Sequence, residues 1–225
     1  MTDDVAYTQK LSRHRNVMQI EDVKPQIDFS FVASNSTLAG EVFVSPYASV
    51  WYNATLRGDV NPIRLGSYSS IGDSCALFTA CSLPVGVPSS ITIGKHVIIE
   101  EKCSIYPCII DNNVFIGTNS IIGEGARIEQ GAMIAPNSYV PHGRLIPAKQ
   151  LWGGNPVKYI RDLTEEEIYA VYMQTYDLWN LAQKHLNGFN VGKDSETDEV
   201  KIDPESLMSK YLGDNYFQWR AKYYY

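Results

Sequence analysis

The stretch IIDNNVFIGTNSIIGEGARIEQGAMIAPNSYVPHGRLI, residues 109–146, decides the fold. An aliphatic residue recurs in it at every sixth position: Ile110, Ile116, Ile122, Ile128, Ile134, Val140 and Ile146. A period of six matches neither the 3.6-residue period of an α-helix nor the two-residue period of an ordinary strand. It fits a coil with three flat sides of about six residues each, in which one aliphatic side chain per side points inward. The stretch therefore predicts a parallel β-helix.

The same six-residue step continues upstream of this stretch, with two interruptions. It is met in three groups: Val32, Leu38, Val44, Val50 and Leu56; Leu65, Ile71 and Leu77; Ile93, Ile99 and Ile105. We predict that the interruptions are loops inserted between coils, because lengthening a surface loop costs little free energy. They are DVNPIR (59–64) and SLPVGVPSSIT (82–92). The step from Ile105 to Ile110 is only five residues and predicts a local distortion of the coil. We assign the β-helix to residues 31–150.

Two further positions of the repeat carry small residues. Glycine often follows the aliphatic residue, and we attribute this to backbone angles that other residues resist: Gly66, Gly72, Gly94, Gly117 and Gly123. The position two residues before the aliphatic holds all four cysteines: Cys75, Cys81, Cys103 and Cys108. They form no CxxC pair, which argues against a common zinc site. We interpret them as small core residues of a protein in a reducing compartment.

The segments outside the β-helix follow other patterns. Residues 151–188 are predicted to be a linker and a C-terminal helix packed on the β-helix. In LTEEEIYAVYMQTYDLWNLAQKHL (163–186), Thr164 and Glu167 form a capping box, and Gly188 is a plausible stop. The apolar stripe of this helix consists of Ile168, Val171, Thr175, Leu178 and Ala182. Residues 1–30 form an N-terminal extension.

The C-terminal tail, residues 189–225, ends in the aromatic stretch YLGDNYFQWRAKYYY (211–225). Aromatic side chains at this density are expected to be buried, against either the body of the protein or a partner. We assign the tail to partner contacts and keep the body as the alternative.

Composition excludes some classes of function. The net charge of −6 argues against a nucleic-acid partner, since phosphate contacts require a basic surface. No apolar run approaches the roughly 18 residues that a membrane-spanning helix needs, so only a peripheral position at a membrane is expected. The N-terminus lacks the apolar core of a secretory signal, and two early aspartates weaken its reading as a mitochondrial presequence. The cluster at residues 13–15 is the only hint of a presequence.

Two stretches carry a family resemblance that covers residues 32–185. SVWYNATLRGDVNPIRLGSYSSIGD (49–73) resembles the γ-class carbonic anhydrases, and LWGGNPVKYIRDLTEEE (151–167) is similar to the members of that family in mitochondrial respiratory complex I. The resemblance implies a left-handed parallel β-helix with a C-terminal helix, assembled as a trimer. It also implies that Arg57 and Asp59 of the RGD motif, together with Asp73, lie at the subunit interface.

The resemblance further identifies three positions where the family's enzymes carry zinc-binding histidines, two from one subunit and one from its neighbour. In this chain they are Phe78, in SIGDSCALF (70–78), and Glu101 and Tyr106, in EEKCSIYPC (100–108). Phenylalanine has no lone pair to donate, and a neutral tyrosine, with a pKa near 10, is a poor ligand. A catalytic zinc with three protein ligands is therefore not expected, and no residue is assigned as catalytic.

These substitutions imply a non-catalytic subunit of a heterotrimer with two other family members. The resemblance places that trimer on the matrix side of the mitochondrial inner membrane, peripheral to it and attached to the membrane arm of complex I. The chain's own ligands bind no cofactor. One zinc could still lie at the inter-subunit site between the two partners.

Three alternatives stay open. One is a zinc enzyme that uses Glu101 and a cysteine. Another is a hexapeptide acyltransferase with His96 or His142 as its base. The third is a β-helical scaffold of a different assembly, such as a cytoskeletal adaptor. We expect the histidines to be solvated or capping side chains rather than ligands: His14, His96, His142 and His185.

Overall fold

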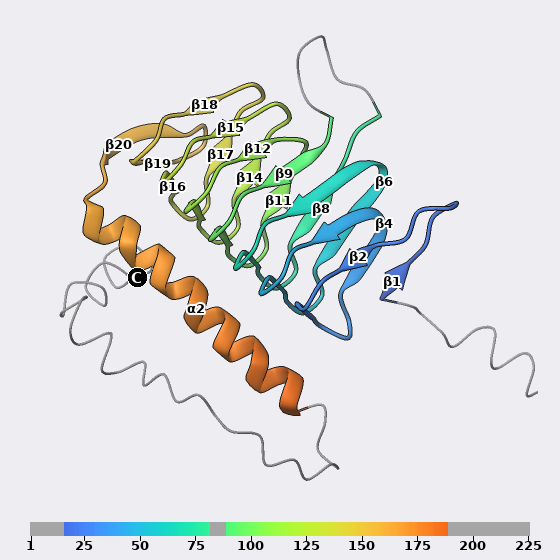
Figure 1. The fold of residues 1–225 in the computed structure, drawn as a ribbon. Coiled ribbons are helices and arrows are strands. Elements are labelled where there is room, and N and C mark those ends of the chain that lie inside the picture. Colours follow the sequence, from blue (N-terminus) through green and yellow to red (C-terminus); the bar gives the residue numbers. More distant parts are fainter. Residues whose placement is uncertain (1–15, 82–88, 189–225) are drawn as a thin grey trace, which may run out of the picture.

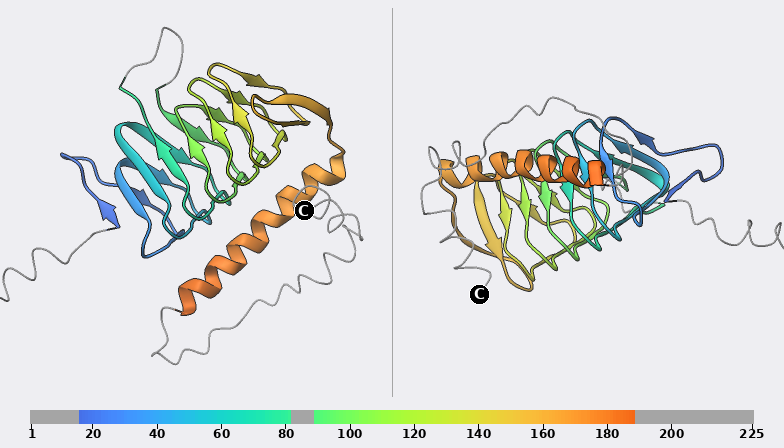
Figure 2. Two further views of the ribbon diagram at one scale, coloured as in Figure 1. Left: turned by 180° about the vertical axis from the view of Figure 1, so that it is seen from behind. Right: turned by 90° about the horizontal axis from the view of Figure 1, so that it is seen from below.

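The computed structural model describes residues 16–81 and 89–188. It is a parallel β-helix with one long α-helix lying along its length (Figures 1 and 2). The hexapeptide prediction is thereby confirmed, while the left hand stays a prediction from the family resemblance. Residues 1–15, 82–88 and 189–225 lie outside the described residues. The fold therefore does not test the expectations for residues 1–15 of the N-terminal extension, for the tip of the second interruption or for the tail.

One side of the coil, here called the helix side, is covered by α2 (Glu165–Gly188). Its strands form an eight-stranded sheet: β3 (Phe31–Val32), β5 (Ser49–Val50), β7 (Ser70–Ile71), β10 (Ile98–Ile99), β13 (Phe115–Ile116), β16 (Met133–Ile134), β19 (Gln150–Gly153) and β20 (Lys158–Asp162). All neighbours are parallel except β19 and β20, which form an antiparallel hairpin whose turn contains a cis Asn155–Pro156 bond. No sequence feature had predicted this hairpin.

The other two sides share a 12-stranded sheet, because β4 (Thr37–Val44) and β6 (Thr55–Leu65) run through the corner between them. The Phe78 side continues with β8 (Ala76–Phe78), β11 (Ser104–Ile105), β14 (Ile121–Ile122) and β17 (Tyr139–Val140). The Arg127 side continues with β9 (Ile91–Ile93), β12 (Ile109–Ile110), β15 (Arg127–Ile128) and β18 (Leu145–Ile146). Two short strands before the coil, β1 (Val17–Met18) and β2 (Gln26–Ile27), pair with β4.

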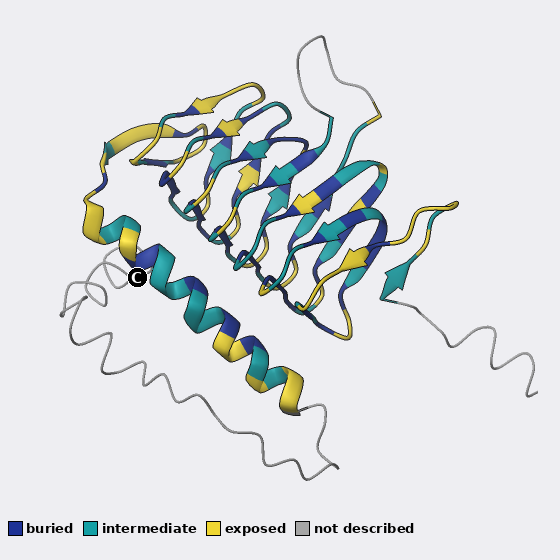
Figure 3. Ribbon diagram, viewed as in Figure 1, coloured by how far each residue is buried: buried dark blue, intermediate teal, exposed yellow. Residues whose placement is uncertain are grey.

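Strand register confirms the period of six. Ile116 pairs with Ile134, 18 residues on, so one coil has three sides of six residues. The pairing of Ile93 with Ile110 is one residue shorter, as the five-residue step predicted. The aliphatic residues of the repeat are almost completely buried and form one continuous core through the coils (Figure 3).

The first interruption of the repeat is a strand and not the predicted loop. Residues 59–64 lie inside β6, whose pairing with β4 shifts register between Gly40 and Val42. The extra residues bulge outward there while the ladder continues on both sides, and Pro62 lies within the bulge, where its missing N–H is tolerated. The side chain of Asn61 fixes the bulge by donating a hydrogen bond to the Ala80 carbonyl oxygen at 2.6 Å.

The glycines that follow the aliphatic residues serve a different purpose from the one predicted. Positive φ angles occur instead at other corner residues, such as Tyr68, His96 and Asn119. A Cβ on Gly66 would lie 2.3 Å from the carbonyl oxygen of Gly94 in the next coil, closer than real Cβ contacts allow. Close approach of successive backbones, rather than backbone angle, requires glycine there.

The cysteine prediction holds for three of the four residues. Cys75, Cys103 and Cys108 are buried in the core, but Cys81 is exposed. Cys81 follows the end of β8, at the point where the chain leaves the coil for the second interruption, so the six-residue pattern no longer directs its side chain inward. Its assignment as a core residue is wrong.

Helix α2 packs on the β-helix through its predicted stripe. Val171, Thr175 and Ala182 are buried, and Ile168 and Leu178 pack against the core. Toward the other end of the helix, a second cluster adds Trp179, which the predicted stripe did not include. This packing fixes α2 over the helix side along most of the coil (Figure 2).

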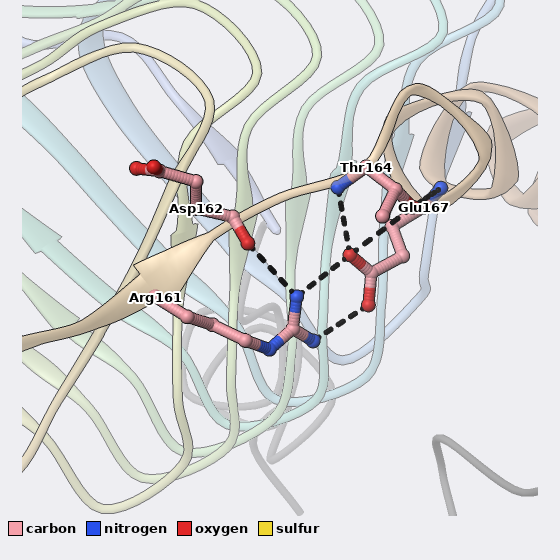
Figure 4. A network of polar contacts seen from close by, with 4 residues as sticks. All are labelled: Arg161, Asp162, Thr164 and Glu167. Carbon is pink, nitrogen blue, oxygen red and sulfur yellow. Dashed lines mark hydrogen bonds and ion pairs between the residues drawn. The ribbon is translucent and has the colours of Figure 1, made fainter.

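The capping box at the start of α2 is confirmed and extended by an arginine (Figure 4). The N–H of Thr164 donates to Glu167 Oε2 at 2.9 Å, and the N–H of Glu167 donates to Thr164 Oγ1 at 3.3 Å. Both terminal nitrogens of Arg161 donate hydrogen bonds to the same carboxylate, at 2.8 and 2.6 Å. The hydrogen bonds from Arg161 hold the pKa of Glu167 below its ordinary value.

Glu167→Gln is therefore expected to destabilise the protein by about 1–2 kcal/mol near pH 7, because it weakens both the cap and the charge-assisted pair. Because the folded pKa is lowered, this stabilisation is complete above the unfolded pKa of about 4.3 and disappears as the pH falls through the folded value. Urea unfolding of both proteins between pH 3 and 7 measures the effect. Glu165→Gln, which breaks an exposed contact with Lys149, is the matched control and should cost less than about 0.5 kcal/mol. An equal loss in both variants would contradict the assignment.

Candidate functional site

Two of the three predicted ligand positions lie together on the Phe78 side. Phe78 ends β8, Tyr106 directly follows β11, and these strands pair with Leu77 opposite Ile105. Because Leu77 and Ile105 point into the core, the next residues point outward. The two ring centroids are 6.4 Å apart, and Tyr106 is 37% exposed.

The RGD motif extends this pair by one coil. Arg57 pairs with Phe78 in the strand register, and its guanidinium carbon lies 5.9 Å from the centre of the Phe78 ring. The Arg57 side chain also donates hydrogen bonds to Asp59 Oδ2, one of them from Nε at 3.2 Å. Arg57, Phe78 and Tyr106 thus form a column, called the Phe78 column below, along the edge of the Phe78 side.

Glu101, the third ligand position, lies at the opposite edge of the same side. It occupies the turn between β10 and β11, where the chain passes from the helix side to the Phe78 side. There it lines a groove beside Asp73, whose Oδ1 accepts a hydrogen bond from the Tyr52 N–H at 2.9 Å. Within one chain, therefore, Phe78 and Tyr106 come together and Glu101 does not join them.

The donor chemistry of these positions does not fit a zinc ion. Phe78 offers no lone pair, and no group of three or more His, Cys, Asp or Glu side chains within residues 16–81 and 89–188 could hold a metal. The buried thiols do not supply the missing ligand, because Cys75, Cys103 and Cys108 lie in the core of the coil and not at the outward-facing ligand positions. Cys75 Sγ donates to the Glu100 carbonyl at 2.8 Å, Cys103 Sγ to that of Gly117 at 3.3 Å, and burial raises the pKa of Cys108 to about 12.

Two histidines, which were expected to be solvated or capping side chains, instead hold α2 in place. His96 Nδ1 lies 2.9 Å from Thr175 Oγ1, and its ring stacks on Tyr68 with centroids 5.2 Å apart. Burial lowers the pKa of His96. His185 Nδ1 lies 2.8 Å from the Tyr52 hydroxyl. These contacts join residues far apart in sequence, which is why no local pattern indicated them.

His142 is the exposed histidine that the acyltransferase alternative would need. Its Nδ1 accepts a hydrogen bond from the Glu124 N–H at 3.2 Å, so it fixes a turn between coils.

No helix among the described residues is long and apolar enough to cross a membrane.

The fold and its repeat define the class of the protein. Residues 107–142 match the family described as bacterial transferase hexapeptide, six repeats. A solved hexapeptide transferase family protein from Anaplasma phagocytophilum superposes with a TM-score of 0.69 at 31% identity, covering 75% of this chain and 97% of the other. The chain is a hexapeptide-repeat β-helix protein.

Sequence relatives define the family within that class. γ-Carbonic anhydrase 2, mitochondrial, of Arabidopsis thaliana is 35% identical over 202 residues, which cover 89% of this chain and 71% of the relative. γ-Carbonic anhydrase-like 1, mitochondrial, of the same plant is 41% identical over 142 residues, covering 63% of this chain and 56% of the relative. The chain belongs to the γ-carbonic anhydrase family.

Proposed function

We propose that this chain is a non-catalytic subunit of a γ-carbonic anhydrase-type heterotrimer. The observation that carries the proposal is the donor set at the three ligand positions, Phe78, Glu101 and Tyr106, in which phenylalanine has no lone pair and only glutamate is an ordinary zinc ligand. Substrate turnover at a site built from these residues is not expected. The chain instead contributes shape and contacts to its assembly.

The positions of the three residues agree with sites that are shared between subunits. Glu101 lies at one edge of the Phe78 side and the Phe78 column at the other. When three such sides face a common axis, the Glu101 edge of one subunit meets the Phe78 column of the next. A chain that lacks ligands at both edges spoils two of the three sites. The third, between the two partner subunits, can still bind zinc.

The surface of the Phe78 side is suited to such an assembly. Its outward ladder of Thr55, Ala76, Ser104, Ile121 and Tyr139 carries no charge, and Ile121 is 42% exposed. The Arg127 side, by comparison, carries Arg64 and Arg127 at outward positions. A flat, uncharged side with aromatic residues at its edge is typical of the core of a protein–protein interface.

The proposed location is the matrix side of the mitochondrial inner membrane, on the membrane arm of respiratory complex I. Mitochondrial relatives and the resemblance of residues 151–167 to complex I members support it. Purification of the native assembly, followed by identification of its chains, tests the proposal. Two other family members and complex I subunits should co-purify. A pure homotrimer without respiratory partners would refute it.

Asp59→Asn tests the proposed interface directly. Once Asp59 is changed, Arg57 lacks its carboxylate partner, and breaking one half of an interfacial charge pair costs about 2 kcal/mol or more, or about 30-fold in the dissociation constant. Analytical ultracentrifugation of the reconstituted trimer measures the change. Asp111→Asn, which removes the partner of Arg127 on the opposite side, is the control and should leave assembly unchanged. Equal behaviour of the two variants would argue against this interface.

A further inference from the structure

A groove of about 660 Å³ runs between α2 and the helix side, and only its Glu101 edge takes part in the proposed function. Residues of five successive coils line it, from Trp51 to Asn137, so it is about 20 Å long at a spacing near 4.8 Å per coil. The opposite wall belongs to α2 and consists of Gln174, Leu178, Leu181 and His185.

The carboxylates of the groove all lie on its coil wall. Asp73, Glu100 and Glu101 line it from the coils, and its described lining contains no lysine or arginine. Glu100 accepts hydrogen bonds from the N–H and hydroxyl of Thr118, but no described residue binds the carboxylate of the exposed Glu101. On the facing wall, Leu181 is 43% exposed. An occupant that fits would present cations to one wall and apolar side chains to the other.

One segment of the chain itself has this pattern. In FQWRAKY, residues 217–223, apolar and polar side chains alternate. In an extended conformation such a segment places Phe217, Trp219 and Tyr223 on one side and Arg220 and Lys222 on the other. The two sides match in kind the leucines on one wall of the groove and the carboxylates on the other.

The segment is also within reach. Helix α2 ends at Gly188, and Leu181 and His185, close to that end, line the groove. The 28 residues from 189 to 216 connect the helix end to Phe217. A chain of that length spans about 29 Å on average, more than the length of the groove. Seven extended residues, at about 3.3 Å each, cover its about 20 Å.

We propose that residues 217–223 of the same chain bind in this groove, with Phe217 and Trp219 against Leu178 and Leu181 and with Arg220 and Lys222 facing the carboxylates. This gives the tail a place on the body of the protein instead of the partner contact expected from the sequence. The proposal does not depend on the heterotrimer, and its test uses the full chain alone.

Zero-length carbodiimide cross-linking tests the contact, because it joins a lysine amine to a carboxylate only when the two touch. We expect a cross-linked peptide pair between Lys222 and Glu101, Glu100 or Asp73. Lys149 and Glu165, 2.6 Å apart, provide the internal positive control in the same digest. Lys222→Arg keeps the charge but removes the reactive amine and should abolish the new pair alone. Formation of the control pair without any Lys222 pair would overturn the proposal.

Isotope mixing separates docking within one chain from docking between copies. Cross-links in a mixture of ¹⁴N- and ¹⁵N-labelled protein should contain one label only, and mixed pairs would assign the groove to a second copy and overturn the proposal. Trypsin gives an independent measurement. Glu101→Gln should speed cleavage after Arg220 about 2- to 5-fold, as expected for one lost ion pair, but leave cleavage after Lys210 unchanged. Equal acceleration at both sites, or at neither, would contradict docking in this groove.

Discussion

Gly66→Ala is expected to destabilise the protein by about 3 kcal/mol or more, because the added methyl group would overlap the backbone of the next coil. Its carbon would lie 2.3 Å from the Gly94 carbonyl oxygen and 2.5 Å from the carbonyl carbon. Both are backbone atoms, and the Gly66 N–H bonds the Ile93 carbonyl at 2.9 Å, so the coils cannot separate without losing ladder hydrogen bonds. Thermal unfolding followed by circular dichroism should show a midpoint lower by about 6–12 °C.

Gly143→Ala is the matched control for this prediction. Gly143 has a φ of +65°, but no heavy atom lies within 4 Å of the position of an added Cβ. Its substitution introduces only the left-handed backbone strain, about 1–2 kcal/mol. A larger loss at Gly143 than at Gly66 would mean that backbone angle, and not the approach of successive coils, is what glycine provides in this repeat.

The comparison of Gly66 with Gly143 shows how far the sequence could lead. The period of six predicted the coil, its inward residues and the distortion before Ile110, because every aliphatic residue of the repeat must be buried. It could not distinguish two reasons for glycine, since a close approach of backbones and a positive φ both select the same residue type. Only the distance between successive backbones separates them.

The ends of the repeat were harder to predict for a related reason. Cys81 continues the pattern of Cys75, yet it is exposed because the coil has already ended there. Residues 59–64 break the pattern, yet they stay within β6 because hydrogen bonding to β4 does not depend on side-chain period. A hydrophobic period indicates only which residues are buried. It does not indicate where the backbone hydrogen bonds between the strands of successive coils begin and end.

The candidate site shows the same division. Family resemblance located Phe78, Glu101 and Tyr106, and their residue types alone led to the prediction that no three-ligand zinc site forms. That Phe78 and Tyr106 share one edge while Glu101 lies at the other follows only from the three-dimensional coil. The groove beside Glu101 could not be foreseen at all, because contacts such as Tyr52 with His185 join residues 133 positions apart.

The triple variant Phe78→His, Glu101→His, Tyr106→His should gain zinc binding and carbonic anhydrase activity together. All three side chains lie at the surface, since Glu101 and Tyr106 are exposed and Phe78 is half-buried at the end of β8, so the coil should accept histidine at each without repacking. In a trimer made only of this variant, the Glu101 edge of one subunit would meet the Phe78 column of the next. Every shared site would then hold three imidazoles. Three histidines and one open position are the donor set of catalytic zinc.

Metal analysis of the purified trimer and stopped-flow CO₂ hydration measure this gain. We expect about one zinc per subunit in the triple variant and a rate above background by several orders of magnitude, since bound zinc lowers the pKa of its water from 15.7 to about 7. The double variant that keeps Phe78 is the control: each of its sites has only two histidines, so it should bind zinc weakly and stay inactive. Cobalt substitution, read by visible absorption, reports the site independently of activity. Stoichiometric zinc in the unaltered chain would overturn the non-catalytic assignment, because it would show that ligands other than these three positions complete a site.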